Sequence, residues 1–296
     1  MPLLGEIFAL LTALLWSATS LIFAEAANRI GSIQLNINRL IFALVILSVA
    51  IFSFQIEIAL TSTQLIYLAI SGIIGLVIGD HFLFKAYQHI GPRFTMLLMA
   101  LSPGLTAIFG IFLFNEFLSL WGTLGVLITL AGIALVILEK KEIPNAKYKI
   151  SRVGILFGII AAIGQSVGLI FAKFAFEISY VNGFTAAFYR IFFSVILLFP
   201  FLILLRKYHN PILLYKKDIK ALWLTIAGSI VGPVLGISFS MIAITYTKIG
   251  IAATLMSTMP IIMVPMIIFI YKEKISSRSI LGAVIAVAGI AILFLK

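Results

Sequence analysis

The sequence predicts an all-α integral membrane protein with ten transmembrane helices, arranged as two inverted five-helix repeats. Three observations predict this fold. Of the 296 residues, 62% are hydrophobic and 10% are charged, whereas a soluble domain carries about 25% charged residues. Apolar runs of about 20 residues, long enough to cross a hydrocarbon core of about 30 Å, follow one another along the chain. The second half also repeats the spacing of proline, glutamate and glycine seen in the first half.

The apolar runs are expected to be helices, because an isolated strand in lipid would leave its backbone polar groups unpaired. Most connections between them are short; the polar segments 139–152 and 206–220 are the long ones. No basic segment or small-residue cleavage site accompanies the first run, so it is expected to be a retained span rather than a signal peptide. The predicted spans are 3–24, 33–53, 63–88, 92–114, 119–138, 151–175, 182–205, 219–247, 249–270 and 276–295.

The repeat is visible in residues that apolar composition alone would not align. Pro260 and Glu273 lie 157 residues after Pro103 and Glu116, and several glycines keep the same offset. Each copy contains five predicted spans, and an odd number of spans turns the second copy upside down in the bilayer, an architecture found in secondary transporters. The predicted domains are a first five-helix repeat at 1–138, a polar linker at 139–150 and a second repeat at 151–296.

The repeated prolines and glutamates are predicted to have structural roles. Pro103 and Pro260 lie inside predicted spans, where proline removes a helix hydrogen bond, so both are expected to kink their helices. Glu116 and Glu273 fall in the tight connections that follow. A carboxylate there accepts hydrogen bonds from the amides that open the next helix, so both are predicted to be caps.

Small residues recur along one face of the third and eighth spans. Gly75 and Gly79 are four residues apart, and so are their counterparts Gly232 and Gly236. This spacing allows close helix approach in lipid, and both static packing and a surface that moves during a conformational change fit it. Pro233 is expected to interrupt the eighth span and free a carbonyl group that then lines a cavity.

Each half ends in proline, a glutamate 13 residues later, and glycines 9 and 16 residues after the glutamate. With this pattern, and with Trp16-Ser17 in the first span, the chain resembles the drug/metabolite transporter superfamily, and more narrowly its EamA-type transporters. The resemblance implies a central cavity between the halves, alternating access by rocking, a small-metabolite substrate and a prokaryotic inner membrane. The residues of the pattern are Pro103, Glu116, Gly125, Gly132, and Pro260, Glu273, Gly282, Gly289.

The orientation in the membrane is predicted in two opposite ways. Lysine and arginine gather in the connections after odd-numbered spans, whereas those after even-numbered spans hold almost none apart from Lys248 and the terminal Lys296. The positive-inside rule therefore places both termini outside the cell. The resemblance to the EamA-type transporters implies that both termini are in the cytoplasm.

Charged residues inside predicted spans are the main candidates for a site, because charges in lipid are costly and usually face an interior cavity. In a functional interpretation Arg39, Lys85 and Arg190 attract the negative end of a substrate, and Asp80 holds a positive end or a proton. In a structural interpretation these groups form ion pairs, Asp80 with Lys85 or Arg39, or extend toward the membrane surface. His81, next to Asp80, is a second candidate for proton coupling.

Polar and aromatic residues at mid-span complete the predicted binding surface. Trp16 and Ser17 in the first span, and Gln165 at the matching depth of the sixth, either line the cavity or hydrogen-bond one helix to another. Tyr87 and Tyr246 are predicted to add a mixed apolar surface for an amphipathic substrate.

These features together predict a secondary transporter of a small polar or amphipathic metabolite. The preferred substrate is an amino acid or related organic ion, exported and coupled to protons, to an exchanged metabolite or to its own gradient. A protein that moves a lipid or lipid-linked headgroup is the alternative.

The chain has no phosphate-binding loop motif, no cysteine and no metal motif around its three histidines, so no enzyme, cofactor or metal is predicted. The expected partners are the substrate and the bilayer, without nucleic acid, and the protein is expected to be a monomer or homodimer.

Overall fold

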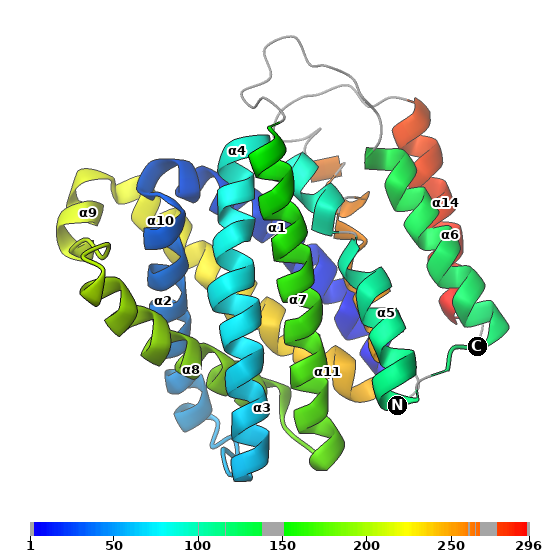
Figure 1. The fold of residues 1–296 in the computed structure, drawn as a ribbon, viewed down its shortest axis with the longest axis horizontal. Coiled ribbons are helices and arrows are strands. Elements are labelled where there is room, and N and C mark those ends of the chain that lie inside the picture. Colours follow the sequence, from blue (N-terminus) through cyan, green and yellow to red (C-terminus); the bar gives the residue numbers. More distant parts are fainter. Residues whose placement is uncertain are drawn as a thin grey trace.

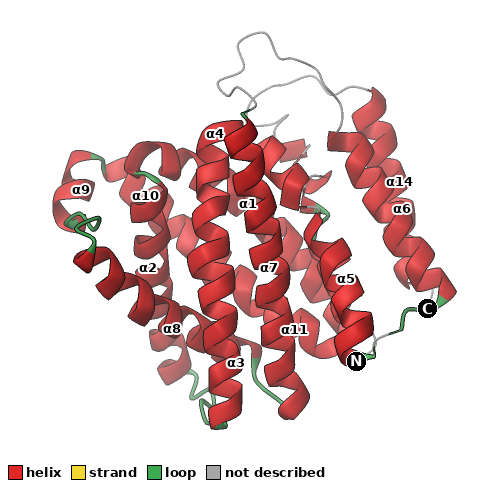
Figure 2. Cartoon of the chain, in the orientation of Figure 1, coloured by secondary structure: helices red, strands yellow, loops and turns green. Residues whose placement is uncertain are grey.

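The computed structural model describes residues 3–99, 101–115, 117–137, 151–259, 261–263, 265–266 and 277–294. Regular structure within these ranges is helical throughout (Figure 2), which confirms the all-α part of the predicted fold class. Six helical segments are long and apolar enough to cross a membrane, and shorter apolar helices accompany them. The inverted arrangement of ten spans and the division at 139–150 stay predictions.

Most of the described helices lie within the predicted spans, but a short helix at Pro211–Lys217 falls in the predicted polar segment 206–220, and the helix that begins at Ile249 ends at Met256, within the predicted span 249–270. In the first half they are α1 (Leu4–Ile30), α2 (Ser32–Ser53), α3 (Ser62–Gly72), the π-helix η1 (Ile73–Gly79), α4 (Asp80–Met99), α5 (Leu101–Phe114) and α6 (Leu120–Ile137). In the second half they are α7 (Arg152–Ile178), α8 (Gly183–Leu204), α9 (Pro211–Lys217), α10 (Ile219–Ser229), the π-helix η2 (Ile230–Ile237), α11 (Ser238–Tyr246), α12 (Ile249–Met256) and α14 (Ser277–Phe294).

The boundary between the third and fourth predicted spans lies inside α4. Gly91 has φ 74° and ψ 165°, a left-handed conformation outside the helical region. Glycine adopts this conformation without steric cost, and Pro92 then begins the next helical stretch. The element therefore consists of two helices that meet at Gly91.

The two halves of the chain pack through many shared contacts. Helix α6 lies beside α14, α4 lies beside α7, and α1 contacts both η2 and α11 (Figure 1). Large apolar side chains such as Phe112, Val49 and Ile203 are exposed on the outside. This is the arrangement expected of helices that face lipid, with polar side chains kept in the interior.

Two π-helices occupy equivalent positions in the halves, and the sequence patterns did not predict them. η1 begins at Ile73 and η2 begins at Ile230, 157 residues later. Each contains the repeated glycine pair, and η2 also contains Pro233, which has no backbone N–H to donate. π-helical turns are rare and frequently lie at functional sites.

The repeated glycines place each π-helix directly against the first helix of the opposite half. A Cβ atom on Gly164 of α7 would lie 2.8 Å from the Cα atom of Gly79, and one on Gly168 would lie 3.0 Å from the Cα atom of Gly75. Between η2 and α1, a Cβ atom on Gly236 would lie 2.6 Å from Nε1 of Trp16. Close backbone contact of this kind requires glycine.

Replacing Gly72 with alanine should destabilise the protein by about 1–3 kcal/mol, as overpacked interiors do. The new Cβ atom would lie 2.2 Å from the backbone carbonyl oxygen of Arg190, which cannot move independently of α8. Thermal unfolding in detergent measures the effect. Gly122→Ala is the matched control, because its Cβ atom would meet only side-chain atoms, the nearest 3.4 Å away. Equal unfolding temperatures for both variants would contradict the close contact between α3 and α8.

Three of the four residues predicted to kink or cap helices, Pro260, Glu116 and Glu273, lie outside the described residues. Pro103 lies within the bounds of α5. Their predicted roles stay predictions.

Candidate functional site

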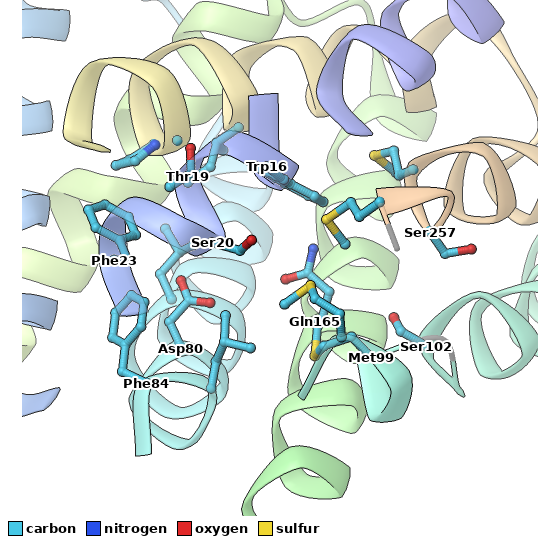
Figure 3. A pocket seen from close by; sticks show the side chains of 18 of the residues that line it. Trp16, Thr19, Ser20, Phe23, Asp80, Phe84, Met99, Ser102, Gln165 and Ser257 are labelled. Carbon is cyan, nitrogen blue, oxygen red and sulfur yellow. The ribbon is translucent and has the colours of Figure 1, made fainter. Parts of the chain in front are cut away.

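A cavity lined by both halves of the chain lies in the interior. It encloses about 870 Å³ of empty space, its mouth included. Figure 3 shows its wall, to which α1 contributes Trp16, Thr19, Ser20 and Phe23, and to which α4 contributes Asp80 and Phe84. Further lining residues are Arg39, Leu76, Leu83, Tyr87, Met96, Met99, Ser102, Gln165, Leu169, Arg190, Gly232, Pro233, Ile237, Ala253, Met256, Ser257 and Met259.

An ion pair between Arg39 of α2 and Asp80 of α4 forms part of the wall. Nη2 of Arg39 donates a short hydrogen bond to Oδ2 of Asp80, and the two side chains are 5% and 13% exposed. The Arg39 guanidinium also lies 4.8 Å from the ring centroid of Phe84 and 5.7 Å from that of Phe23. Aromatic faces attract a cation, so these rings and the carboxylate together fix the buried guanidinium.

Asn36 joins this ion pair to the π-helix η1. Its Oδ1 accepts hydrogen bonds from Nε of Arg39 at 3.1 Å and from Nη2 at 2.9 Å. Its Nδ2 donates to the carbonyl oxygens of Leu76 at 3.1 Å and Val77 at 3.3 Å. The side chain of one buried asparagine therefore satisfies two carbonyl groups of η1 and orients the arginine that pairs with Asp80, the first residue after η1.

Arg190 of α8 is the counterpart of Arg39 in the second half, but its surroundings differ. The residue is 2% exposed and lines the cavity. Among the described residues its Nε has no hydrogen-bond partner, and Nη1 contacts only the sulfur of Met241, at 3.4 Å. Ile237 occupies the place that Asp80 holds in the first half, so no repeat-related carboxylate is present to pair with Arg190.

The rest of the wall is apolar and weakly polar. Met96, Met99, Met256 and Met259 contribute thioether side chains to the wall, in which Figure 3 labels Met99. Unbranched, polarizable methionine side chains adapt to ligands of different shapes. The cavity thus combines a buried ionic cluster with an adaptable apolar surface.

Six of the nine residues predicted to bind substrate line this cavity, namely Trp16, Arg39, Asp80, Tyr87, Gln165 and Arg190. Ser17 is buried beside it and instead donates hydrogen bonds to the carbonyl oxygens of Ala13 at 2.6 Å and Met259 at 3.1 Å.

Lys85, His81 and Tyr246 lie outside the cavity lining. Lys85 does not pair with Asp80; its Nζ lies 5.2 Å from the ring centroid of Phe157. The His81 ring packs against Phe82, and Tyr246 is 49% exposed near the end of α11.

Three residues that line the cavity or bond to its wall were not predicted to be site residues, namely Asn36, Phe23 and Phe84. Asn36 precedes Arg39 by three residues, a spacing at which helical side chains meet, and this signal was present in the sequence. Phe23 and Phe84 had no comparable signal, because the chain contains 25 phenylalanines.

Comparison with known proteins places the chain in a family. The EamA-like transporter family profile matches residues 3–138 and again residues 152–295. The chain belongs to the EamA-like transporter family. It is 36% identical over 87 residues to an uncharacterized transporter of Clostridium kluyveri, a match that covers 26% of this chain and 28% of that relative. The chain also matches a protein of known crystal structure. The match covers 100% of this chain and 98% of the other, with a TM-score of 0.76 and 18% sequence identity, and it shows a shared fold.

Membership in the EamA-like transporter family makes the protein a multi-pass membrane transporter rather than an enzyme. The interior cavity of this EamA-like transporter holds charged groups that the surrounding lipid would not tolerate.

Proposed function

We propose that this EamA-like transporter exports a small amphipathic organic ion, an amino acid or a related organic acid, across the inner membrane. The single observation that carries the proposal is the cavity in which Arg39, Asp80 and Arg190 share a wall with methionine and aromatic side chains. The ionic cluster orients the charged end of the solute, and the apolar wall receives its body.

We further propose that the halves move by alternating access about the two π-helices. η1 packs on α7 and η2 packs on α1, so each interrupted helix contacts the first helix of the other half. Interrupted helices border the substrate sites of many secondary transporters. Asp80 follows η1 directly and is the proposed coupling residue, whether the transporter uses protons or an exchanged metabolite.

Trp16 should report the binding of a substrate through its fluorescence. The chain has three tryptophans, of which Trp16 lines the cavity, while Trp121 and Trp223 are 59% and 65% exposed. A Trp121→Phe/Trp223→Phe variant therefore retains only the cavity tryptophan. Titration of this variant with amino acids, organic acids, nucleotides and lipid headgroups should give a saturable response to an amphipathic ion.

The Trp16→Phe variant, which keeps the two exposed tryptophans, is the control and should give no response. A response to lipid headgroups alone would support a lipid-moving protein instead. If no solute changes the emission of Trp16, although the variant is folded, the cavity is not a substrate site.

A further inference from the structure

We propose that the cavity selects a monocarboxylate with an apolar body, and that Arg190 binds the carboxylate group. This inference rests on the proposed transport function and narrows its substrate class. Arg190 is assigned as the residue that determines charge specificity. Arg39 and Asp80 are bonded to each other and do not bind the carboxylate of the substrate.

The charge balance of the cavity is the first argument. Its charged lining residues are Arg39, Asp80 and Arg190. The carboxylate of Asp80 is already bonded to Arg39, which is also held by Asn36. Within the described residues, two guanidinium groups face one carboxylate, and that carboxylate is bonded to Arg39, so Arg190 has no carboxylate bonded to it. A buried charge normally has a partner, and a ligand with one negative charge supplies it.

The hydrogen bonding of Arg190 is the second argument. Buried donors almost always have a partner, yet within the described residues Nε of Arg190 has none and Nη1 contacts only a sulfur atom. Arginine presents its N–H groups in a planar fork that matches both oxygens of a carboxylate. The open donors of a residue that is 2% exposed and lines the cavity are therefore suited to a carboxylate of the substrate.

The backbone of Arg190 is held in place, and there is room for its guanidinium beside η1. Its backbone carbonyl oxygen packs against Gly72 and accepts a hydrogen bond of 2.7 Å from Oγ of Ser194. A Cβ atom on Gly75 would lie 3.2 Å from Nη2 of Arg190, so the absence of a side chain on Gly75 leaves room for the guanidinium beside η1. The backbone at Arg190 is thus held against α3, and its guanidinium lies beside η1 at the cavity wall.

The remaining lining favours an apolar body over an ammonium group. The carboxylate of Asp80 is engaged by Arg39, so it is not free to bind the ammonium group of a substrate. Phe84, Met99 and Met256 instead offer an aromatic and thioether surface. A carboxylate with an aryl or alkyl body satisfies both parts of the cavity.

Three probes with one body and different charges test the proposal: 4-phenylbutanoate, 4-phenylbutanamide and 4-phenylbutylamine. Their dissociation constants are measured by Trp16 fluorescence in the full-length Trp121→Phe/Trp223→Phe protein. The carboxylate should bind about 10- to 100-fold more tightly than the amide, as expected for hydrogen bonds to a charged group. In an Arg190→Gln variant this preference should disappear. Arg206→Gln removes an exposed arginine outside the cavity and should leave the preference unchanged.

Two further variants keep the test decisive if Arg190→Gln does not fold. Arg190→Lys keeps the charge but loses the planar fork, so the carboxylate should still be preferred, at weaker affinity. Asp80→Asn leaves both arginines without a carboxylate, so it should shift the preference toward the dicarboxylate phenylsuccinate. Equal binding of carboxylate and amide by the parent protein, or a carboxylate preference that survives in folded Arg190→Gln, overturns the proposal. If the amine binds best, as detected by Trp16 fluorescence, the carboxylate preference is wrong but the cavity is still a substrate site. If neither these probes nor the wider solute panel gives a response, both the carboxylate preference and the proposed transport function are refuted.

Discussion

Replacing Asp80 with alanine should lower the free energy of unfolding by about 3–5 kcal/mol and abolish transport, because it leaves the buried guanidinium of Arg39 without its carboxylate. The Asn36 side chain and the two aromatic rings stay in place, but none of them supplies a negative charge. Unfolding in detergent gives the stability change, and solute flux in proteoliposomes gives the activity.

The double variant Arg39→Met/Asp80→Leu separates stability from function. Apolar residues in place of a buried ion pair are often neutral or stabilising, so this variant should unfold at a higher temperature than Asp80→Ala, although Oδ1 of Asn36 loses its donor. It should still fail to transport, because the ionic cluster is gone. Wild-type stability of Asp80→Ala, or transport by the double variant, would show that the ion pair does not have the role assigned to it.

Asn36→Leu should cost about 2–4 kcal/mol of stability and reduce the rate of transport. The substitution removes the donor for the carbonyl oxygens of Leu76 and Val77 and the acceptor for Arg39, and buried polar groups left unsatisfied cost about 1–3 kcal/mol each. The loss of the link between η1 and the ion pair should appear as slower flux even at temperatures where the variant is fully folded.

Asn38→Leu is the matched control for this experiment. Asn38 is equally buried on the same helix, but its Nδ2 makes one hydrogen bond, of 3.0 Å, to the hydroxyl group of Tyr215. Its replacement should cost about 1 kcal/mol and leave the flux of the folded protein unchanged. Equal losses from the two substitutions would contradict the linking role of Asn36.

Much of the architecture follows from the sequence because lipid allows few structures. Apolar length predicts the helices, and the repeated proline, glutamate and glycine pattern predicts the family, which the matches at 3–138 and 152–295 confirm. The cost of charge in lipid also identified Arg39, Asp80 and Arg190, the charged residues that line the cavity.

Helical periodicity explains why two neighbouring candidates lie elsewhere. Asp80, Phe84 and Tyr87 are spaced by four and three residues, so they share one face of α4, and all three line the cavity. His81 and Lys85 follow one residue later on an adjacent face and pack against Phe82 or Phe157. Charge alone favoured these two residues, although helical periodicity places them on a different face from Asp80.

The π-helices and the hydrogen bonds from Asn36 to η1 had no comparable signal in the sequence. Glycines four residues apart predict close packing, but the same spacing fits an ordinary α-helix. The two π-helices contact α7 and α1, which belong to the other half of the chain. Asn36 is understood only once the carbonyl groups of Leu76 and Val77 are seen to lie within its reach.

The central claim is that solute crosses the membrane through this cavity. Its most direct test is solute flux in proteoliposomes for a variant in which a large side chain fills the cavity. Ser102 of α5 lines the cavity and is 5% exposed, whereas Phe112 on the same helix is 79% exposed. Flux is measured for the solute that gives the largest Trp16 response. Ser102→Trp should abolish flux while the protein stays folded, and Phe112→Trp should transport at the wild-type rate. Wild-type flux through a folded Ser102→Trp variant would contradict the account.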